Sequence, residues 1–275
     1  MPTVEDIARQ METIAPLHLA EDWDNVGLLV GHGQQPVRRL MTCLTVTPAS
    51  ASEAIQQQAD LIVTHHPMPF RELKRLTNDN TPGRLLLDLI EHRVAVYSPH
   101  TAFDSALQGI NQQLASGLGL EGVTPLRPLP ASPASEAASL SSADSSLLGA
   151  GRYGRLPESA TLADVAEKLK RLLQIDHLQF VGDRDRSVQT VAVACGAAGE
   201  FLTPARRLGC DVLITGETNF HTCLEAEATG VALILIGHYA SERFAVEQLA
   251  TVLAQAFADI KVWPSTREAD PLTWI

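Results

Sequence analysis

The second half of this 275-residue chain repeats a pattern found in its first half. The segment "CDVLITGET" at 210–218 matches "ADLIVTHHP" at 59–67, and "IGHYASERFAVEQLA" at 236–250 matches "SPHTAFDSALQGINQQLA" at 98–115. Both halves carry a His-x-x-x-acid pattern directly after an apolar run and at the start of an expected helix. Internal repetition of this kind predicts two similar lobes built from one supersecondary pattern.

Short apolar runs alternate with amphipathic segments along each half. Helices are expected over 4–14, 49–59, 82–93, 104–119 and 161–173, and strands over 26–31, 40–47, 60–65 and 94–98. Thr161 is the expected N-cap of its helix, with Asp164 three residues on. Strands that alternate with helices predict an α/β fold with a largely parallel sheet.

A segment rich in proline and serine, 124–150, interrupts this alternation. Because it offers few apolar anchors, we interpret it as a linker. The expected organisation is therefore a first α/β lobe over 1–123, the linker over 124–150, and a second α/β lobe over 151–275. The repeat core of the second lobe spans about 188–260.

Composition narrows the classes of function. The net charge of −11 disfavours binding to nucleic-acid backbones. There is no apolar stretch of membrane-spanning length, and the acidic N-terminus lacks the features of a signal peptide. The four cysteines form no CxxC pair and are expected to be buried, reduced thiols. We therefore expect a soluble, cytoplasmic protein.

Histidines and acids gather at or just past the expected strand ends. In open α/β sheets, ligands bind beyond the carboxyl ends of the strands, so these side chains are expected to line a common pocket between the lobes. They are His65, His66, His100, Asp104, Glu217, His221, His238 and Glu242. The remaining histidines, at positions 18, 32, 92 and 177, lie elsewhere and are expected to be ordinary surface or packing residues.

Imidazole and carboxylate ligands suit divalent zinc, iron, manganese or nickel. Since the adjacent side chains of His65 and His66 diverge, each could serve one of two ions, bridged by Asp104 or Glu242. Helix capping is the alternative for both acids. His100 is expected to be a ligand, an orienting residue or a proton shuttle, and His221 to line the pocket or transfer protons.

The segment "EDWDNVGLLVG" at 21–31 has two interpretations. Asp24 and Asn25 are turn-forming residues, and a structural turn packed by Trp23 is the favoured one. In the other, Asp24 or Asn25 reaches the rim of the pocket. The sequence contains no phosphate-binding P-loop, dinucleotide fingerprint, serine-hydrolase elbow or HExxH motif.

The blocks "WDNVGLLVG", "DLIVTHHPMPF", "HTAFD", "DVLITGE" and "GHYASE" resemble the signatures of the Nif3-like dinuclear metal-centre family. Its members are often called GTP cyclohydrolase 1 type 2 homologues. The resemblance implies two related α/β lobes with a di-metal cleft between them, and a toroidal homohexamer built as a trimer of dimers. It also implies five metal ligands, namely His65, His66, Asp104, His238 and Glu242, with the two acids bridging, whereas His100 is usually outside the ligand set.

Two functions follow as hypotheses. The first is a metal-dependent hydrolase that holds two divalent cations per subunit. Its substrate would be a small molecule, with nucleotides among the candidates and GTP ring opening as one candidate reaction. The alternative is a non-enzymatic metal-binding or metal-handling hexameric scaffold. DNA threading through a ring is a third reading, which the net charge of −11 opposes.

Overall fold

The computed structural model describes residues 1–129 and 147–273. These residues divide into two compact units. The first unit consists of Met1–Phe103 and Arg243–Pro271, and the second consists chiefly of Asp104–Glu242. Part of the predicted linker, 130–146, lies outside the described residues. Within the described ranges, no helix is both long and apolar enough to cross a bilayer.

The first unit is built on a five-stranded sheet with the order β1-β4-β3-β2-β13. The strands are β1 (Gly27–Val30), β2 (Arg39–Cys43), β3 (Leu61–Thr64), β4 (Ala95–Ser98) and β13 (Lys261–Pro264). Strands β4, β3, β2 and β13 run parallel, and β1 pairs antiparallel with β4 at one edge. The predicted, largely parallel sheet is confirmed for this unit.

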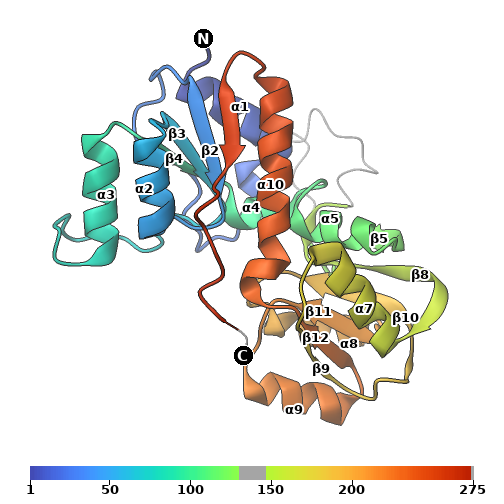
Figure 1. Cartoon of the computed structure of the whole chain (residues 1–275). Helices are drawn as coiled ribbons and strands as arrows, with labels where there is room; N and C mark the ends of the chain where they lie inside the picture. The colour runs from blue at the N-terminus through green and yellow to red at the C-terminus, as the bar shows by residue number, and fades with distance from the viewer. Residues whose placement is uncertain (130–146, 274–275) are drawn as a thin grey trace. The chain divides into compact units, whose positions relative to one another are not determined.

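Helices cover the sheet of the first unit. They are α1 (Val4–Ile14), the 3-10 turn η1 (Leu17–Leu19), α2 (Pro48–Gln56), α3 (Thr81–Glu91), the start of α4 (His100–Ser105) and most of α10 (His238–Ala256). Apolar residues of α2 and α3 pack on one face of the sheet with Met41, Ile62 and Val96, and both helices lie on the same side of the strands in Figure 1. The neighbouring residue Thr42 points the other way and donates to the Val246 carbonyl of α10 at 3.0 Å, as the alternation of a strand requires.

The second unit contains a six-stranded sheet with the order β5-β8-β10-β11-β12-β9. Its strands are β5 (Glu121–Thr124), β8 (Arg152–Thr161), β9 (Gln179–Val181), β10 (Ser187–Ala194), β11 (Val212–Thr215) and β12 (Ala232–Leu235). Strands β10, β11 and β12 are parallel, whereas β9, β8 and β5 pair antiparallel with their neighbours. A small pair formed by β6 (Arg127–Pro128) and β7 (Gly149–Ala150) completes it.

The helices of the second unit are α5 (Ile110–Gly117), α7 (Leu162–Leu173), η2 (Gly199–Phe201), α8 (Leu202–Arg207) and α9 (Phe220–Thr229), with the ends of α4 and α10. Helices α8 and α9 pack their apolar residues on one face of the sheet, against Ala192, Leu213 and Leu233. Thr161 caps α7 through a complete capping box with Asp164, so the predicted helix start is confirmed.

The two units share one topology. The order β1-β4-β3-β2 of the first sheet corresponds to the order β9-β12-β11-β10 of the second, and in both the first strand of the four runs antiparallel to its neighbour. The connecting helices also correspond, because α2 and α3 occupy the positions of α8 and α9. The repeat detected in the sequence thus has a counterpart in the strand order.

Three details differ from the sequence-based expectation. The C-terminal strand β13 pairs with β2, so the end of the chain belongs to the first unit rather than to a lobe over 151–275. Residues 104–123 group with the second unit instead of the first. The helix expected over 104–119 is split into α4 and α5, because Gly109 is the N-cap of a new helix.

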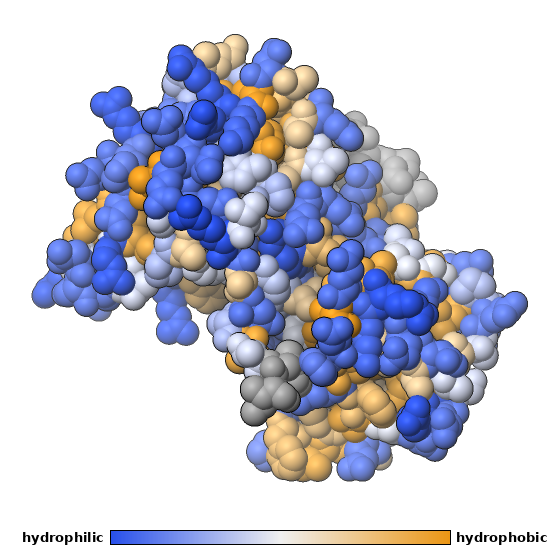
Figure 2. Space-filling view, in the orientation of Figure 1, coloured by the Kyte–Doolittle hydropathy of each residue, from blue (hydrophilic) through white to orange (hydrophobic). Residues whose placement is uncertain are grey.

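The interior is apolar and the cysteines are reduced. Cys43 and Cys210 are buried, Cys195 and Cys223 are partly buried, and all four are free thiols. Burial raises the pKa of Cys210 to about 12 and raises that of Cys43 further. The surface visible in Figure 2 is mostly hydrophilic, with scattered apolar patches, which is usual for a globular protein.

Candidate metal centre

Three histidines of the first unit form a cluster. His65 and His66 follow β3, and His100 begins α4 directly after β4. Because β3 and β4 are parallel neighbours, their carboxyl ends place these residues together. Each imidazole offers a ring nitrogen, and these nitrogens all lie within 4.8 Å of one another. This grouping could hold a metal ion.

The backbone fixes the position of the His65–His66 pair. The amide of His65 donates to the Cys43 carbonyl at 3.0 Å, and the amide of His66 donates to the Leu44 carbonyl at 2.8 Å. These bonds extend the parallel pairing of β2 and β3 past the strand ends. The two rings are tilted by 51° with centroids 5.1 Å apart, and a ring nitrogen of each lies within 4.8 Å of the other, so the expected divergence of the adjacent side chains is small here.

Oxygen atoms contact the outer nitrogens of two of these rings. The His66 Nδ1 lies 2.7 Å from the Thr45 hydroxyl, and the His100 Nδ1 lies 2.7 Å from Asp24 Oδ1. Such contacts orient an imidazole, because a nitrogen held by an oxygen leaves the other nitrogen to face a ligand. They are the usual surroundings of histidines that bind metals.

Asp24 is both a structural turn residue and a neighbour of the cluster. Its carboxylate accepts from the Asn25 amide at 2.8 Å, from the Thr101 amide at 3.1 Å and from the Thr101 hydroxyl, in addition to His100. Burial alone would raise the pKa of Asp24, but the bonds from His100 and Thr101 outweigh it and lower that pKa. The interpretation in which Asp24 reaches the site is the one that the structure supports.

His100 has an unusual backbone conformation, with φ at +25°. L-residues adopt this region rarely, and such strain persists only where surrounding contacts hold it. Here the bonds from Thr101 and His100 to the buried Asp24 carboxylate supply those contacts. The family resemblance implies that His100 is usually outside the ligand set, and here one of its ring nitrogens lies within 4.8 Å of those of His65 and His66.

Glu268 supports the cluster from the C-terminal segment, and sequence analysis did not identify it. Its carboxylate accepts from the amides of Leu44 and Thr45, which precede α2, and lies 3.6 Å from Arg243. Burial raises the pKa of Glu268 despite these contacts. No motif marks Glu268, because it lies far along the chain in a segment without periodicity.

A second group of candidate ligands lies in the second unit, at the start of α10. His238 Nε2 is 3.2 Å from Glu242 Oε2 one turn later, and His238 Nδ1 is 2.9 Å from Glu217 Oε1. The hydrogen bond that His238 donates to Glu242, followed by the contacts with Glu217, raises the pKa of His238 to about 9. Glu217, predicted to line the pocket, therefore orients His238.

Asp104 belongs to the same unit as His238 and Glu242. Burial raises the pKa of the Cys195 thiol, and the nearby charges of Glu242 and Asp104 raise it further. The backbone carbonyl of Asp104 accepts from the Asn111 side chain at 3.1 Å, and Asn111 in turn accepts from the Cys195 amide at 2.8 Å.

Two glycines allow the strand ends to approach α10. A Cβ on Gly196 would lie 2.5 Å from Glu242 Oε1, and a Cβ on Gly216 would lie 2.7 Å from the Ser241 hydroxyl and 3.0 Å from the His238 Cα. Gly196 also has φ at +69°. Only glycine leaves room here, so the backbone forms a close cradle around the His238–Glu242 pair.

His221 lies apart from these contacts. It is exposed in the first turn of α9, where its ring contacts that of Phe220 with centroids 5.9 Å apart. Its proposed role in proton transfer stays a prediction. His18, His32, His92 and His177 belong to neither group of candidate metal ligands in the described residues.

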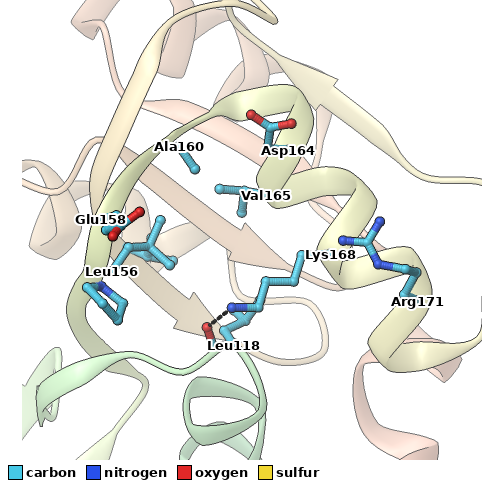
Figure 3. Close-up of a pocket in the computed structure, with 10 residues that line it drawn as sticks. Leu118, Leu156, Glu158, Ala160, Asp164, Val165, Lys168 and Arg171 are labelled. Carbon is cyan, nitrogen blue, oxygen red and sulfur yellow. Dashed lines mark hydrogen bonds between the residues drawn. The ribbon is translucent and has the colours of Figure 1, made fainter.

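Several surface hollows accompany these groups. A hollow of about 660 Å³ in the second unit is lined by Glu217 together with Glu200, Thr218 and Asn219. Another, of about 380 Å³, lies between β8 and α7 (Figure 3), where Lys168 points to the Leu118 carbonyl and donates to it at 2.6 Å. The second hollow contains none of the predicted site residues, so the first is the one adjacent to candidate ligands.

The donor set fits a borderline divalent metal. Neutral imidazole nitrogens and carboxylate oxygens bind zinc, iron, manganese and nickel, and thiolates are not required. Each unit by itself supplies such donors, namely three imidazoles in the first and one imidazole with carboxylates in the second. The fold and these residues define an α/β protein with a candidate metal centre.

Comparison with known proteins assigns the family. The model of the Duf34/NIF3 family (NGG1p interacting factor 3) matches residues 2–271, so the chain belongs to this family. The GTP cyclohydrolase 1 type 2 homolog of Clostridium acetobutylicum is 33% identical over 239 residues, which cover 87% of this chain and 85% of that protein. The family resemblance of the sequence is confirmed.

Solved structures show the same fold. The Staphylococcus aureus hypothetical protein SA1388 is 29% identical and covers 100% of both chains with a TM-score of 0.87. The Bacillus cereus protein related to NIF3 is 24% identical and covers 100% of this chain and 99% of its own, with a TM-score of 0.88. The second likeness concerns the fold alone.

Proposed function

We propose that this protein is a metal-dependent hydrolase of a small substrate. The single observation that carries the proposal is the cluster of His65, His66 and His100 at the ends of parallel strands, with two of its rings oriented by oxygen atoms. Structural metal sites are usually closed by four protein ligands, whereas catalytic sites combine a few imidazoles and carboxylates with open positions. The name GTP cyclohydrolase 1 type 2 homolog, carried by a relative, points in the same direction.

The proposed ligands are the five that the family resemblance implies. His65, His66, Asp104, His238 and Glu242 together would hold two divalent cations. His100 and Asp104 lie four residues apart in α4. In a helix, residues four apart lie on the same face.

Bound cations would lower the pKa of a coordinated water and polarise the bond under attack. The residues of this chain would then manage protons and orientation. His100, whose Nδ1 is held by Asp24, has its Nε2 available to accept or return a proton. Glu217 holds the His238 Nδ1 and so leaves Nε2 as the ligand atom.

Metal analysis of the purified protein tests the ligand set. We expect two divalent ions per chain in the wild type, and a loss of at least one in His66→Ala and in Glu242→Ala. His92→Ala is a matched control, because His92 is exposed and its Nδ1 lies 2.8 Å from the Asp88 carbonyl of its own helix. Equal metal content in all four proteins would refute the proposed ligands.

Turnover separates a hydrolase from a metal-handling scaffold. Metal-loaded wild type is assayed against GTP, other nucleotides, cyclic nucleotides and phosphodiesters, with His66→Ala alongside. Turnover that disappears in the variant supports the hydrolase. Metal binding without turnover in either protein supports the scaffold. Sedimentation of the same samples tests the homohexamer that we also propose.

A further inference from the structure

Two large aromatic side chains of the first unit are exposed side by side. Trp23 is 64% exposed and Phe70 is 51% exposed, and their ring centroids are 6.2 Å apart. They come from separate segments, which the Asn25 side chain joins by donating to the Pro69 carbonyl at 2.9 Å. Folding would normally bury such rings, so an exposed pair held in place indicates a binding surface. We call Trp23 and Phe70 the aromatic ledge.

The aromatic ledge borders the histidine cluster. The ring of His100 lies 6.1 Å from that of Trp23 and 6.0 Å from that of Phe70, with interplanar angles of 79° and 78°. His100 in turn lies 5.2 Å from the ring of His65. A molecule lying on the ledge would therefore be in contact with the edge of the candidate metal centre.

Positive charge follows the aromatic ledge along the chain. Arg71, Lys74 and Arg75 come directly after Phe70 and are exposed, and Glu72 is the one acid among residues 70–76. In the described part of the chain these three cations have no ion-pair partner, although the whole chain carries a net charge of −11. We call Arg71, Lys74 and Arg75 the basic segment. A local excess of positive charge on an acidic protein attracts an anion.

We propose that the aromatic ledge and the basic segment bind the non-reacting part of the substrate, and that the substrate is a nucleoside phosphate. Its planar base would stack on the ledge, and its phosphate would be neutralised by the basic segment. The rings of Trp23 and Phe70 are tilted by 52°, so the base would stack on one ring and meet the other at its edge. Asp22 precedes Trp23, which places the phosphate on the Phe70 side.

This inference rests on the proposed function, since it assigns the substrate of the same centre. Stacking of a base on an aromatic side chain accepts any base, because every base has a planar face. The ledge therefore determines the class of the ligand and not the identity of the base. Selectivity for one base would need polar contacts that Trp23 and Phe70 do not offer.

The test is calorimetric titration of chelator-treated, metal-free protein with three probes. They are guanosine 5′-monophosphate, guanosine and ribose 5-phosphate. We expect guanosine 5′-monophosphate to bind most tightly. Trp23→Ala and Phe70→Ala should each weaken it about tenfold, whereas Trp23→Phe should retain most of the affinity. Phe220→Ala is the matched control, because Phe220 is 70% exposed beside His221 in the other unit.

A triple substitution tests the basic segment. In Arg71→Ala/Lys74→Ala/Arg75→Ala, affinity for guanosine 5′-monophosphate should fall and lose most of its salt dependence, while affinity for guanosine should stay unchanged. The control is Arg206→Ala/Arg207→Ala, which removes exposed cations from α8. Unchanged binding of the phosphate in the triple variant would overturn the role of the segment.

Two results would overturn the role of the ledge. One is equal affinity for ribose 5-phosphate and guanosine 5′-monophosphate. The other is a Trp23→Ala variant that binds normally but sediments as a smaller species, which would make the ledge a contact between copies of the chain. Because the titrations use metal-free protein, a failure of the proposed hydrolase to bind metal or turn over substrate leaves their outcome unaffected.

Discussion

The two units use the same acid–histidine pair in opposite surroundings. In the first unit, the side chains of Asp24 and His100 are 1% and 11% exposed, and the carboxylate accepts hydrogen bonds from four donors. In the second unit, the side chains of Glu217 and His238 are 53% and 33% exposed. Both acids contact the Nδ1 of their histidine, but only Asp24 is buried among other hydrogen-bond donors. The contact between acid and histidine therefore stabilises the fold of the first unit, whereas it contributes little to the stability of the second.

Their dependence on pH should also be opposite. The lowered pKa of Asp24 means that its contribution to stability is fully present above the ordinary carboxyl range and is lost as pH falls through the lowered value. The raised pKa of His238 means that its contribution is fully present below the usual 6.5 and is lost as pH rises through about 9. The stabilising contribution of the Asp24–His100 pair is therefore lost at acidic pH, and that of the Glu217–His238 pair at alkaline pH.

The largest expected effect comes from removing each of the two acids in turn. Asp24→Ala removes the acceptor of four hydrogen bonds at a side chain that is only 1% exposed, so the free energy of unfolding should fall by about 3 kcal/mol. Glu217→Ala removes an exposed partner and should change it by less than about 0.5 kcal/mol. Urea unfolding of metal-free proteins measures both. Equal losses would show that burial does not distinguish the two pairs.

The second prediction concerns alkaline pH. In chelator-treated protein, the free energy of unfolding should decrease by about 1 to 2 kcal/mol as pH rises from 6.5 to 9, after allowance for solvent screening of a side chain that is 33% exposed. His238→Gln should flatten this part of the profile. NMR titration of His238 should give a pKa near 9, and Glu217→Gln should lower it. A His238 that titrates at its usual 6.5 would refute the contacts.

The third prediction isolates the glycine cradle of the second unit. Gly196 and Gly230 both have positive φ, at +69° and +75°, but a Cβ meets Glu242 Oε1 only at Gly196. Alanine at either position should cost about 1 kcal/mol through the backbone. Only Gly196→Ala should also displace the carboxylate and reduce metal content. If both variants lose metal equally, backbone strain and not the cradle is responsible.

Much of the fold was predictable from local patterns. Strands such as 60–65 and 94–98 and the helix at 161–173 agree with the structure to within a residue or two at each end, because apolar periodicity and capping residues act over a few positions. The repeat in the sequence predicted two similar lobes, and the two units share one strand order. What local patterns could not show is that β13 returns to pair with β2, since pairing between distant segments leaves no local signal.

The candidate site was likewise predictable only where local patterns mark its residues. His65 and His66 were found because they directly follow β3, and His238 because it begins a helix shortly after β12; strand ends are recognisable in a sequence. The residues that orient them were harder to find: Thr45 and Glu268 approach from other segments, and Asp24 looked like an ordinary turn residue. The ligand set of five residues stays a prediction until metal is measured.

The smallest expected effect concerns the two oxygen contacts that orient histidines in the first unit. The Thr45 hydroxyl contacts His66 Nδ1 and is neutral, whereas Asp24, which holds His100 Nδ1, is a charged acceptor. Thr45→Val keeps the side-chain volume and removes that contact, so metal affinity should fall about tenfold while the free energy of unfolding changes by less than about 1 kcal/mol. Competition with a coloured chelator measures the affinity, and Thr13→Val, on an exposed part of α1, is the control. A Thr45→Val protein with wild-type affinity would show that the Thr45 hydroxyl does not orient His66 for metal binding, in contrast to the role proposed for Asp24 at His100.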